Sequence, residues 1–266
     1  MPFFSSDKSI FEKLLGERTI QVIERDGRRE LRFGNHITQS AISLQEPERL
    51  LLEYTRAMMV GFLFVRKPVS ILHIGLGAGS LPRFIHHHFP ACRQVVVENS
   101  PEVIEVAFRY FFLPLSPKLQ VIEGEGETYL AKAKGRFDLI FLDAFLADGA
   151  PGQVETGPFF ETAREHLAPG GWLVNNVWGS DRANLQRVTE NLALTFANLY
   201  ALSVHSGSNM IFFCGKSGAA QSLAELLQAA EVLAGKIPVE LEKYIKKLGR
   251  ARPRVTGPTV RRQVFA

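Results

Sequence analysis

A glycine-rich turn stands directly after the apolar run at residues 71–74. Gly75, Gly77 and Gly79 form the sequence GLGAG, and a helical pattern follows them. Such a turn lets a ligand approach the backbone closely, and the start of the helix offers unpaired amide N–H groups. The fingerprint of dinucleotide sites places its third glycine or alanine where this chain has Ser80. The spacing therefore favours S-adenosylmethionine (AdoMet) over NAD, although a tight structural turn alone can also require glycines.

Acidic residues follow the next three apolar segments of the chain. Glu98 ends the second segment, Glu125 follows the third in the sequence GEG, and Asp143 follows the fourth. A carboxylate about twenty residues after a glycine turn suits the paired hydroxyls of a ribose, and another acid can accept from an adenine amino group. Any one of them could instead cap a helix or lie in a solvated loop. Three of them at neighbouring strand ends favour a nucleoside-binding crevice.

The elements that must position these residues follow from the hydrophobic pattern. After Pro68, apolar runs alternate with helical segments, which is typical of βαβ units and a parallel sheet. We expect strands at 70–74, 94–98, 119–123, 138–142, 172–177, 201–205 and 209–214, and helices at 81–88, 101–110, 127–134, 158–167 and 181–197. Only three residues join the last two strands, so these must be antiparallel. The prediction is an α/β fold with a Rossmann-like, mostly parallel seven-stranded sheet that ends in an antiparallel hairpin, as in class I AdoMet transferases.

Short β-branched segments precede this pattern. Turn residues separate segments at 19–24, 30–33 and 37–43, which predicts a small β-hairpin unit. Apolar residues at helical spacing predict one amphipathic helix over 46–62. We therefore expect an N-terminal hairpin-and-helix unit at 1–66, a nucleoside-binding catalytic domain at 67–217, and C-terminal helices with a basic tail at 218–266.

Charge and composition exclude several classes of protein. The net charge is +4, and five arginines lie in a C-terminal stretch without acids; 31 basic residues less these five leave 26 against 27 acidic ones. A near-neutral body argues against a nucleic-acid partner. The apolar stretch at 57–65 is too short to span a bilayer, and the first residues lack the pattern of a signal peptide, so we expect no membrane partner and a cytoplasmic protein.

The sequence predicts no metal site and no disulfide. His86, His87 and His88 are consecutive, and consecutive residues of a helix point about 100° apart, so these three cannot converge on one ion. Cys92 and Cys214 are the two cysteines of the chain, and no metal-ligand spacing surrounds either of them.

The motifs, taken together, resemble the spermidine synthase family. Tyr54 is followed in order by GLGAG, by VENSP at 97–101, by AFRYF at 107–111, by GEG, and by FDLIFLD at 137–143. The resemblance covers roughly residues 30 to 215. It implies AdoMet or decarboxylated AdoMet as co-substrate, a small-molecule amine or other nucleophile as acceptor, and a homodimer.

The same resemblance assigns roles to single residues. Glu98 would hold the ribose and Glu125 the adenine, while Asp143 would be the catalytic acid/base that faces the attacking amine. Gln39 and Tyr54 match positions of the family on the substrate side, and Tyr54 could orient the amine. Trp178 follows the fifth strand of the sheet and is a candidate substrate contact, although an aromatic residue there can equally serve packing.

The chain departs from the family on the acceptor side. The family has an aspartate inside the glycine turn where this chain has Ala78, and His-Glu after its tyrosine where this chain has Thr55 and Arg56. A second aspartate of the family is replaced by Leu146. A pocket lined by Arg56 and lacking two carboxylates should bind putrescine poorly.

The sequence is therefore compatible with three functions. An aminopropyltransferase-like enzyme is favoured, an AdoMet-dependent methyltransferase is the alternative that Ala78 favours, and a binding protein without catalysis is the third. The connection over 144–157, rich in glycine, proline and acids, could fold over the site or be a plain surface loop.

Overall fold

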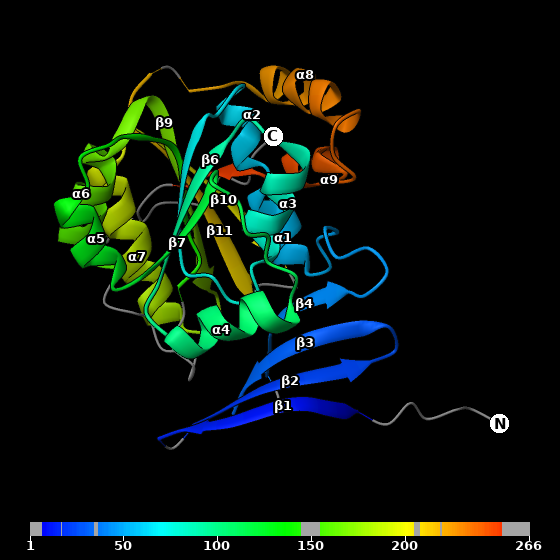
Figure 1. Ribbon diagram of the computed structural model, residues 1–266. Coiled ribbons are helices and arrows are strands. Elements are labelled where there is room, and N and C mark those ends of the chain that lie inside the picture. The colour runs from blue at the N-terminus through cyan, green and yellow to red at the C-terminus, as the bar shows by residue number, and fades with distance from the viewer. Residues whose placement is uncertain are drawn as a thin grey trace.

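The computed structural model describes residues 7–16, 18–34, 37–144, 155–204, 208–218 and 220–251. Within these ranges the chain forms a small antiparallel sheet and a larger mixed sheet that helices cover on both faces (Figure 1). No helix in the described ranges has both the length and the apolar character that a membrane span requires.

The N-terminal sheet has four antiparallel strands in sequential order. They are β1 (Lys8–Leu15), β2 (Arg18–Arg25), β3 (Arg28–Phe33) and β4 (Ile37–Ser43). Asp26 and Gly27 both have positive φ, at 48° and 70°, as a tight hairpin between twisted strands requires. The sequence predicted three of these strands. It missed β1, because this edge strand is largely exposed and does not alternate between apolar and polar residues.

The larger sheet has the strand order β12-β10-β11-β9-β8-β5-β6-β7. Its strands are β5 (Ser70–Ile74), β6 (Arg93–Glu98), β7 (Leu119–Glu123), β8 (Phe137–Leu142), β9 (Leu167–Trp178), β10 (Asn198–Val204), β11 (Asn209–Gly215) and β12 (Gly249–Arg250). The five strands from β9 to β7 are parallel, and β11, β10 and β12 are antiparallel to their neighbours. The mostly parallel sheet and its terminal hairpin are thus confirmed. The strand count of seven was wrong, because the two-residue β12 adds an eighth strand that is too short to leave a pattern.

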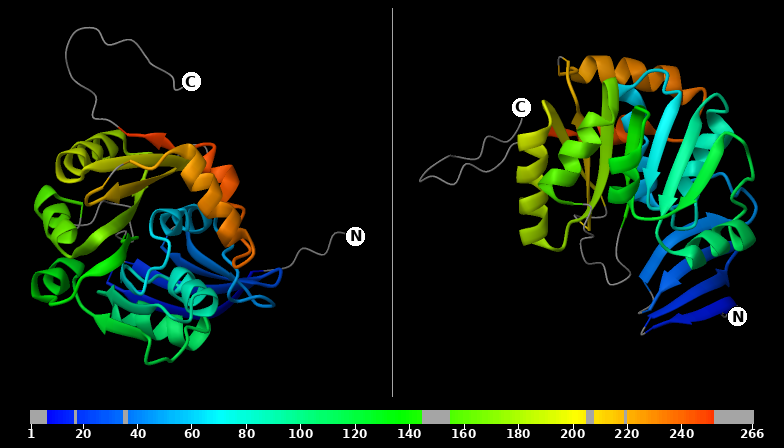
Figure 2. Two further views of the ribbon diagram at one scale, coloured as in Figure 1. Left: turned by 90° about the horizontal axis from the view of Figure 1, so that it is seen from above. Right: turned by 60° about the vertical axis from the view of Figure 1, so that its left-hand side comes forward.

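Helices cover both faces of this sheet (Figure 2). One face carries α5 (Gly126–Lys132), α6 (Gly157–Glu165) and α7 (Arg182–Thr195), and a continuous apolar core lies beneath them. The other face carries α1 (Glu53–Met58), α2 (Gly61–Phe64), α3 (Ser80–His88), α8 (Leu223–Ala234) and α9 (Leu241–Ile245) over a second core. Helix α4 (Pro101–Tyr110) packs with the N-terminal sheet in a third core.

The single helix expected over 46–62 was wrong. The chain forms α1 and α2 instead, and residues 44–52 before them are not helical. The carbonyls of Leu50 and Leu51 accept hydrogen bonds from the Arg56 guanidinium at 3.1 and 2.9 Å rather than from amides one turn later. Apolar spacing alone could not reveal this, because the competing donor is a side chain.

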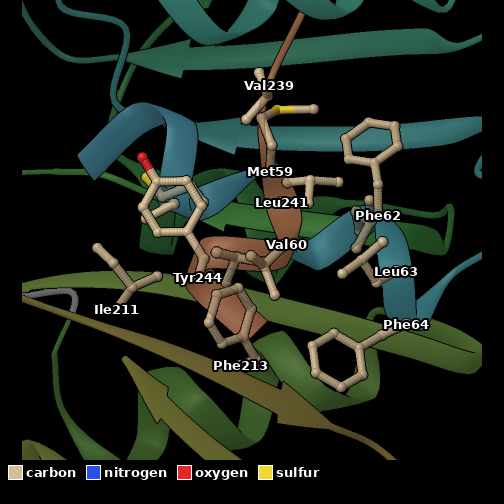
Figure 3. Close-up of a cluster of buried hydrophobic side chains, with 14 of the residues drawn as sticks. Met59, Val60, Phe62, Leu63, Phe64, Ile211, Phe213, Val239, Leu241 and Tyr244 are labelled. Atoms are coloured by element: carbon tan, nitrogen blue, oxygen red, sulfur yellow. The ribbon is translucent and has the colours of Figure 1, made fainter. Parts of the chain in front are cut away.

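Helices α1 and α2 lie deep in the core. Phe64 stacks on Trp172 with 4.0 Å between ring centroids, and Figure 3 shows Val60 among side chains of β11 and α9. A Cβ at Gly61 would lie 2.6 Å from Val174 Cγ2, so the helix backbone rests directly on the sheet. One apolar core therefore contains residues of all three expected domains, whose boundaries at 66/67 and 217/218 remain a prediction.

Candidate functional site

The glycine turn connects β5 to α3 at the carboxyl edge of the sheet. Gly75 donates its N–H to the Val97 carbonyl at 2.9 Å and has a φ of +94°. A Cβ at this position would lie 2.2 Å from the carbonyl oxygen of Asp143. The first glycine is thus required twice, for its backbone conformation and for the close passage of the chain after β8.

The third glycine starts the helix. Gly79 is left-handed, with a φ of +69°, and precedes Ser80 at the first position of α3. A Cβ on Gly79 would come within 2.7 Å of Leu113, and one on Gly77 would come within 2.7 Å of the Ser40 hydroxyl. The turn is therefore closely covered by Ser40 of β4 and by the segment after α4.

Glu98 lies at the end of β6 beside this turn. Its carboxylate accepts the Leu76 N–H at 2.9 Å and the Ser100 N–H at 3.0 Å. Burial raises the pKa of Glu98, and backbone hydrogen bonds from Ser100, Leu76 and Asn99 oppose that rise. The two oxygens have about four lone-pair sites, so three backbone hydrogen bonds leave Glu98 capacity to accept from a ribose hydroxyl.

Glu125 lies near Glu98, at the end of β7. It immediately precedes α5, is exposed, and accepts a hydrogen bond from Asn99 Nδ2 at 3.2 Å. Its negative charge contributes to the raised pKa of Glu98. The structure therefore brings these two predicted acids together along one edge of the sheet, with the glycine turn beside them. Their ligand roles remain predictions.

Asp143 follows β8 and is the centre of a buried polar chain. Its Oδ1 accepts a hydrogen bond from Asn176 Nδ2 at 2.8 Å, and Asn176 Oδ1 accepts one from Asn209 Nδ2 at 3.0 Å. Burial raises the pKa of Asp143 to about 6, although hydrogen bonds from Asn176 and Tyr54 oppose the rise. The second hydrogen bond fixes which way the Asn176 amide faces, so its NH₂ group points at the carboxylate.

Tyr54, on α1, bonds the same carboxylate. Its single O–H is shared between Asp143 and the Gln39 carbonyl, which lies 3.3 Å from the hydroxyl oxygen. Burial and the adjacent charge of Asp143 raise the pKa of Tyr54 well above its ordinary value, so it is a neutral phenol at neutral pH. Gln39 thus contributes its backbone carbonyl to the site. Trp178 ends β9, is half-buried and lies opposite Asn209 in the sheet register; its contact with substrate stays a prediction.

A pocket opens beneath the glycine turn beside Asp143 and Tyr54. Its polar lining comes from the N-terminal sheet, α1, β5 and α3, and the lining residues are Ser40, Tyr54, Thr55, His73, Gly75, Leu76, Ser80, Leu81, Pro82, Phe141 and Asp143. The sequence did not predict Ser40, His73 or Ser80 here. They lie on three separate elements, β4, β5 and α3, and only the packing of these elements brings them to one place.

Arg56 does not line this pocket, so the prediction of a cationic lining was wrong. Its guanidinium turns away to the Leu50 and Leu51 carbonyls and to the Tyr244 hydroxyl. Thr55 does line the pocket, but its hydroxyl donates to the Leu52 carbonyl at 2.8 Å. Leu146 and most of the connection expected over 144–157 lie outside the described residues.

The hydrogen bond from Asn176 gives a testable pH effect. An N–H donor stabilises the ionised carboxylate, so removing it should raise the pKa of Asp143 above its value of about 6, by roughly half to one unit. We expect Asn176→Ala to show this rise in a carbon-13 NMR titration of the Asp143 carboxyl group. Asn198→Ala, which removes a distant surface hydrogen bond to Gly218, should leave the midpoint unchanged. A lower midpoint in Asn176→Ala would contradict the assignment.

The fold and the site together define a class I AdoMet transferase-like protein. A mostly parallel sheet with a terminal antiparallel hairpin carries a glycine turn and acids at successive strand ends. The polyamine aminopropyltransferase of Neisseria meningitidis serogroup A is 30% identical over 238 residues, which cover 88% of this chain and 90% of that protein. The chain belongs to the polyamine aminopropyltransferase family. No family model matches the sequence.

A methyltransferase relative is also similar. The human eEF1A lysine and N-terminal methyltransferase is 30% identical over 222 residues, covering 76% of this chain but 30% of that longer protein. Human methyltransferase-like protein 13, solved in complex with SAH, has a TM-score of 0.64 at 27% identity and covers 74% of this chain and 94% of that one.

Solved spermidine synthases share the fold over more of the chain. A probable spermidine synthase from Corynebacterium glutamicum has a TM-score of 0.72 at 21% identity and covers 96% of this chain and 99% of that one. A spermidine synthase in complex with the transition-state analogue AdoDATO has a TM-score of 0.71 at 18% identity, with coverages of 90% and 83%.

Proposed function

We propose that the protein is a transferase that binds an AdoMet-type nucleoside on the glycine turn and transfers an aminopropyl group to a small amine. The observation that carries this proposal is Asp143, a carboxylate with a pKa of about 6 that adjoins the glycine turn and is held by Asn176. A general base near neutral pH needs such a pKa and a fixed position. Membership of the aminopropyltransferase family supports the same reaction.

The nucleoside is proposed to lie across the carboxyl ends of β5, β6 and β7. Gly75, Gly77 and Gly79 let it approach the backbone, Glu98 accepts from the ribose hydroxyls, and Glu125 accepts from the adenine amino group. Solved proteins of similar fold support an AdoMet-type ligand, since one carries SAH and another carries AdoDATO. Decarboxylated AdoMet is the form that aminopropyl transfer requires.

The reaction makes a clear demand on these residues. The electrophile is the propyl carbon bonded to the positively charged sulfur. The lone pair of the amine forms the new C–N bond while the C–S bond breaks, and the electron pair of the C–S bond stays on sulfur, which becomes a neutral thioether. The amine must lose one proton, which passes to Asp143. The neutral Tyr54 hydroxyl, beside this carboxylate, can hydrogen-bond the amine and orient it.

Methyl transfer from AdoMet is the second candidate, and a specific observation favours it. Ala78 is fully buried in the glycine turn, and its N–H bonds the Ser40 hydroxyl at 3.2 Å. This position therefore offers no carboxylate for the amino group of decarboxylated AdoMet. The similarity to methyltransferases points the same way but covers a smaller share of the chain.

Product analysis separates the two reactions. The purified protein should be incubated with decarboxylated AdoMet or AdoMet and a panel of amines that includes putrescine. The proposal predicts methylthioadenosine and an aminopropylated amine from decarboxylated AdoMet, with slow turnover of putrescine. S-adenosylhomocysteine and a methylated acceptor would establish the alternative, and binding of both nucleosides without any product would reject both. A homodimer and a cytoplasmic location also stay proposals.

Glu98 gives a prediction about nucleoside affinity. Glu98→Ala should weaken binding of methylthioadenosine by roughly 1.5 to 3 kcal/mol, the range for hydrogen bonds to a charged group. Isothermal titration calorimetry measures this directly. Glu123→Ala, at an exposed carboxylate that ends the neighbouring strand β7, is the matched control and should bind as the wild type does. Unchanged affinity in Glu98→Ala would remove the ribose assignment.

A further inference from the structure

The pocket beneath the glycine turn holds two polar side chains that the proposed chemistry leaves unused. His73 lies on β5 and Ser80 opens α3, and they are 2% and 7% exposed. Both line the same pocket as Asp143 and Tyr54. Buried polar groups are nearly always hydrogen-bonded, so each of these side chains requires a partner.

Ser80 has no partner among the described residues. Its Oγ is buried and makes no hydrogen bond to the protein. At the first position of a helix the hydroxyl could turn to a nearby backbone group, yet here it lines the pocket instead. The hydroxyl can donate one hydrogen bond and accept others, so the pocket must supply at least one polar atom to it.

The structure fixes the tautomer of His73. Gln94 donates its Nε2 to the Pro82 carbonyl at 3.1 Å, so its Oε1 faces His73 Nε2 at 2.9 Å. His73 Nε2 must therefore carry the hydrogen. Burial lowers the pKa of His73 to about 4, so the ring is neutral and Nδ1 is an acceptor.

The pocket has room for a water molecule. It offers about 10 Å³ to the centre of a water molecule, and one water needs roughly that much. A buried water typically makes about three hydrogen bonds to groups that otherwise lack partners. The lining offers a hydroxyl without a partner, the acceptor nitrogen of His73 and a carboxylate, so a water has three groups to bond.

We propose that one buried water occupies this pocket, accepts a hydrogen bond from Ser80 Oγ, and donates to His73 Nδ1 and to the Asp143 carboxylate. Ser80 and His73 then become positioning residues that act on Asp143 through this water. A donor to the carboxylate stabilises its ionised form. The significance of this water for catalysis rests on the proposed function, but its presence does not.

Two measurements test the site without any turnover. A crystal structure of the wild-type protein at a resolution that orders buried solvent should show density within hydrogen-bond distance of Ser80 Oγ and His73 Nδ1. A carbon-13 NMR titration of Asp143 should give a midpoint near 6 in the wild type and a midpoint higher by roughly half a unit or more in Ser80→Ala. Ser203→Ala, at an exposed position on β10, is the matched control and should leave the midpoint unchanged.

The outcomes decide the proposal separately from the proposed function. Absence of density at this position in the wild type overturns the proposal, and so does a midpoint in Ser80→Ala that equals that of the wild type. If Ser80→Ala does not fold, the wild-type crystal structure still decides. A water in place, with a shifted midpoint but no product from either nucleoside, would support the site and reject the proposed reaction.

Discussion

Asp143→Asn should lower the rate of transfer by about 10² to 10⁴ while nucleoside affinity changes little. Asparagine keeps the shape of the side chain and can still bond Asn176, but it has no basic oxygen to take the proton from the amine. The nucleoside is proposed to be held by other strand ends, at Glu98 and Glu125, so binding and chemistry should separate. Turnover with an accepted amine and calorimetry with methylthioadenosine should be measured on one preparation.

The role of Asp143 as a base also predicts how the rate depends on pH. Since the pKa of Asp143 is about 6, the wild-type rate should rise as pH increases through 6, and the variant should lose this rise. The folding stability depends on pH in the opposite direction. A carboxyl group whose pKa is raised on folding destabilises the protein at pH values above that pKa, so Asp143→Asn should be at least as stable as the wild type at neutral pH.

That stability provides the control. If Asp143 served chiefly as a cap for the following loop, the variant would lose melting temperature and nucleoside affinity together. Turnover per folded molecule would then survive. Activity within about tenfold of the wild type in folded Asp143→Asn would rule out the role as base.

Gly75→Ala should be the most destabilising substitution in the glycine turn. Its Cβ would lie 2.2 Å from the Asp143 carbonyl oxygen, a backbone atom that cannot move without displacing the chain after β8. The φ of +94° adds strain for any residue with a Cβ. We expect a loss of roughly 3 kcal/mol or more in the free energy of unfolding, the scale of severe overpacking with backbone strain. Denaturant unfolding measures this loss.

Gly235→Ala is the matched control for this effect. Gly235 follows α8 with a φ of −79°, and a Cβ there would meet nothing within 4 Å. Alanine at such a position should leave stability unchanged or raise it by about 0.4 to 1 kcal/mol, because the unfolded chain loses freedom. Equal stability of Gly75→Ala and the wild type would contradict the close approach of Asp143 to the turn. Molecules of Gly75→Ala that do fold should also bind no nucleoside.

The sequence by itself determined the main strands of the larger sheet and the grouping of the glycine turn with three acids at one edge. Apolar runs with short turns place strands by local pattern, and parallel strands bring their carboxyl ends to one edge, so Glu98, Glu125 and Asp143 could be grouped without coordinates. The three glycines could be recognised because glycine is the residue that most readily adopts a positive φ. These features depend on residues close together in the chain.

Tertiary structure alone decided which side chains line the pocket beside Asp143. Arg56 could be expected in the pocket by its position after Tyr54, yet backbone carbonyls and Tyr244 hold its guanidinium elsewhere. The pocket joins Ser40, His73 and Ser80 from separate elements, and the orientation of Asn176 depends on Asn209 across the sheet. Such contacts depend on long-range packing and on which of several donors bonds a given acceptor. Neither produces a periodic pattern in the sequence.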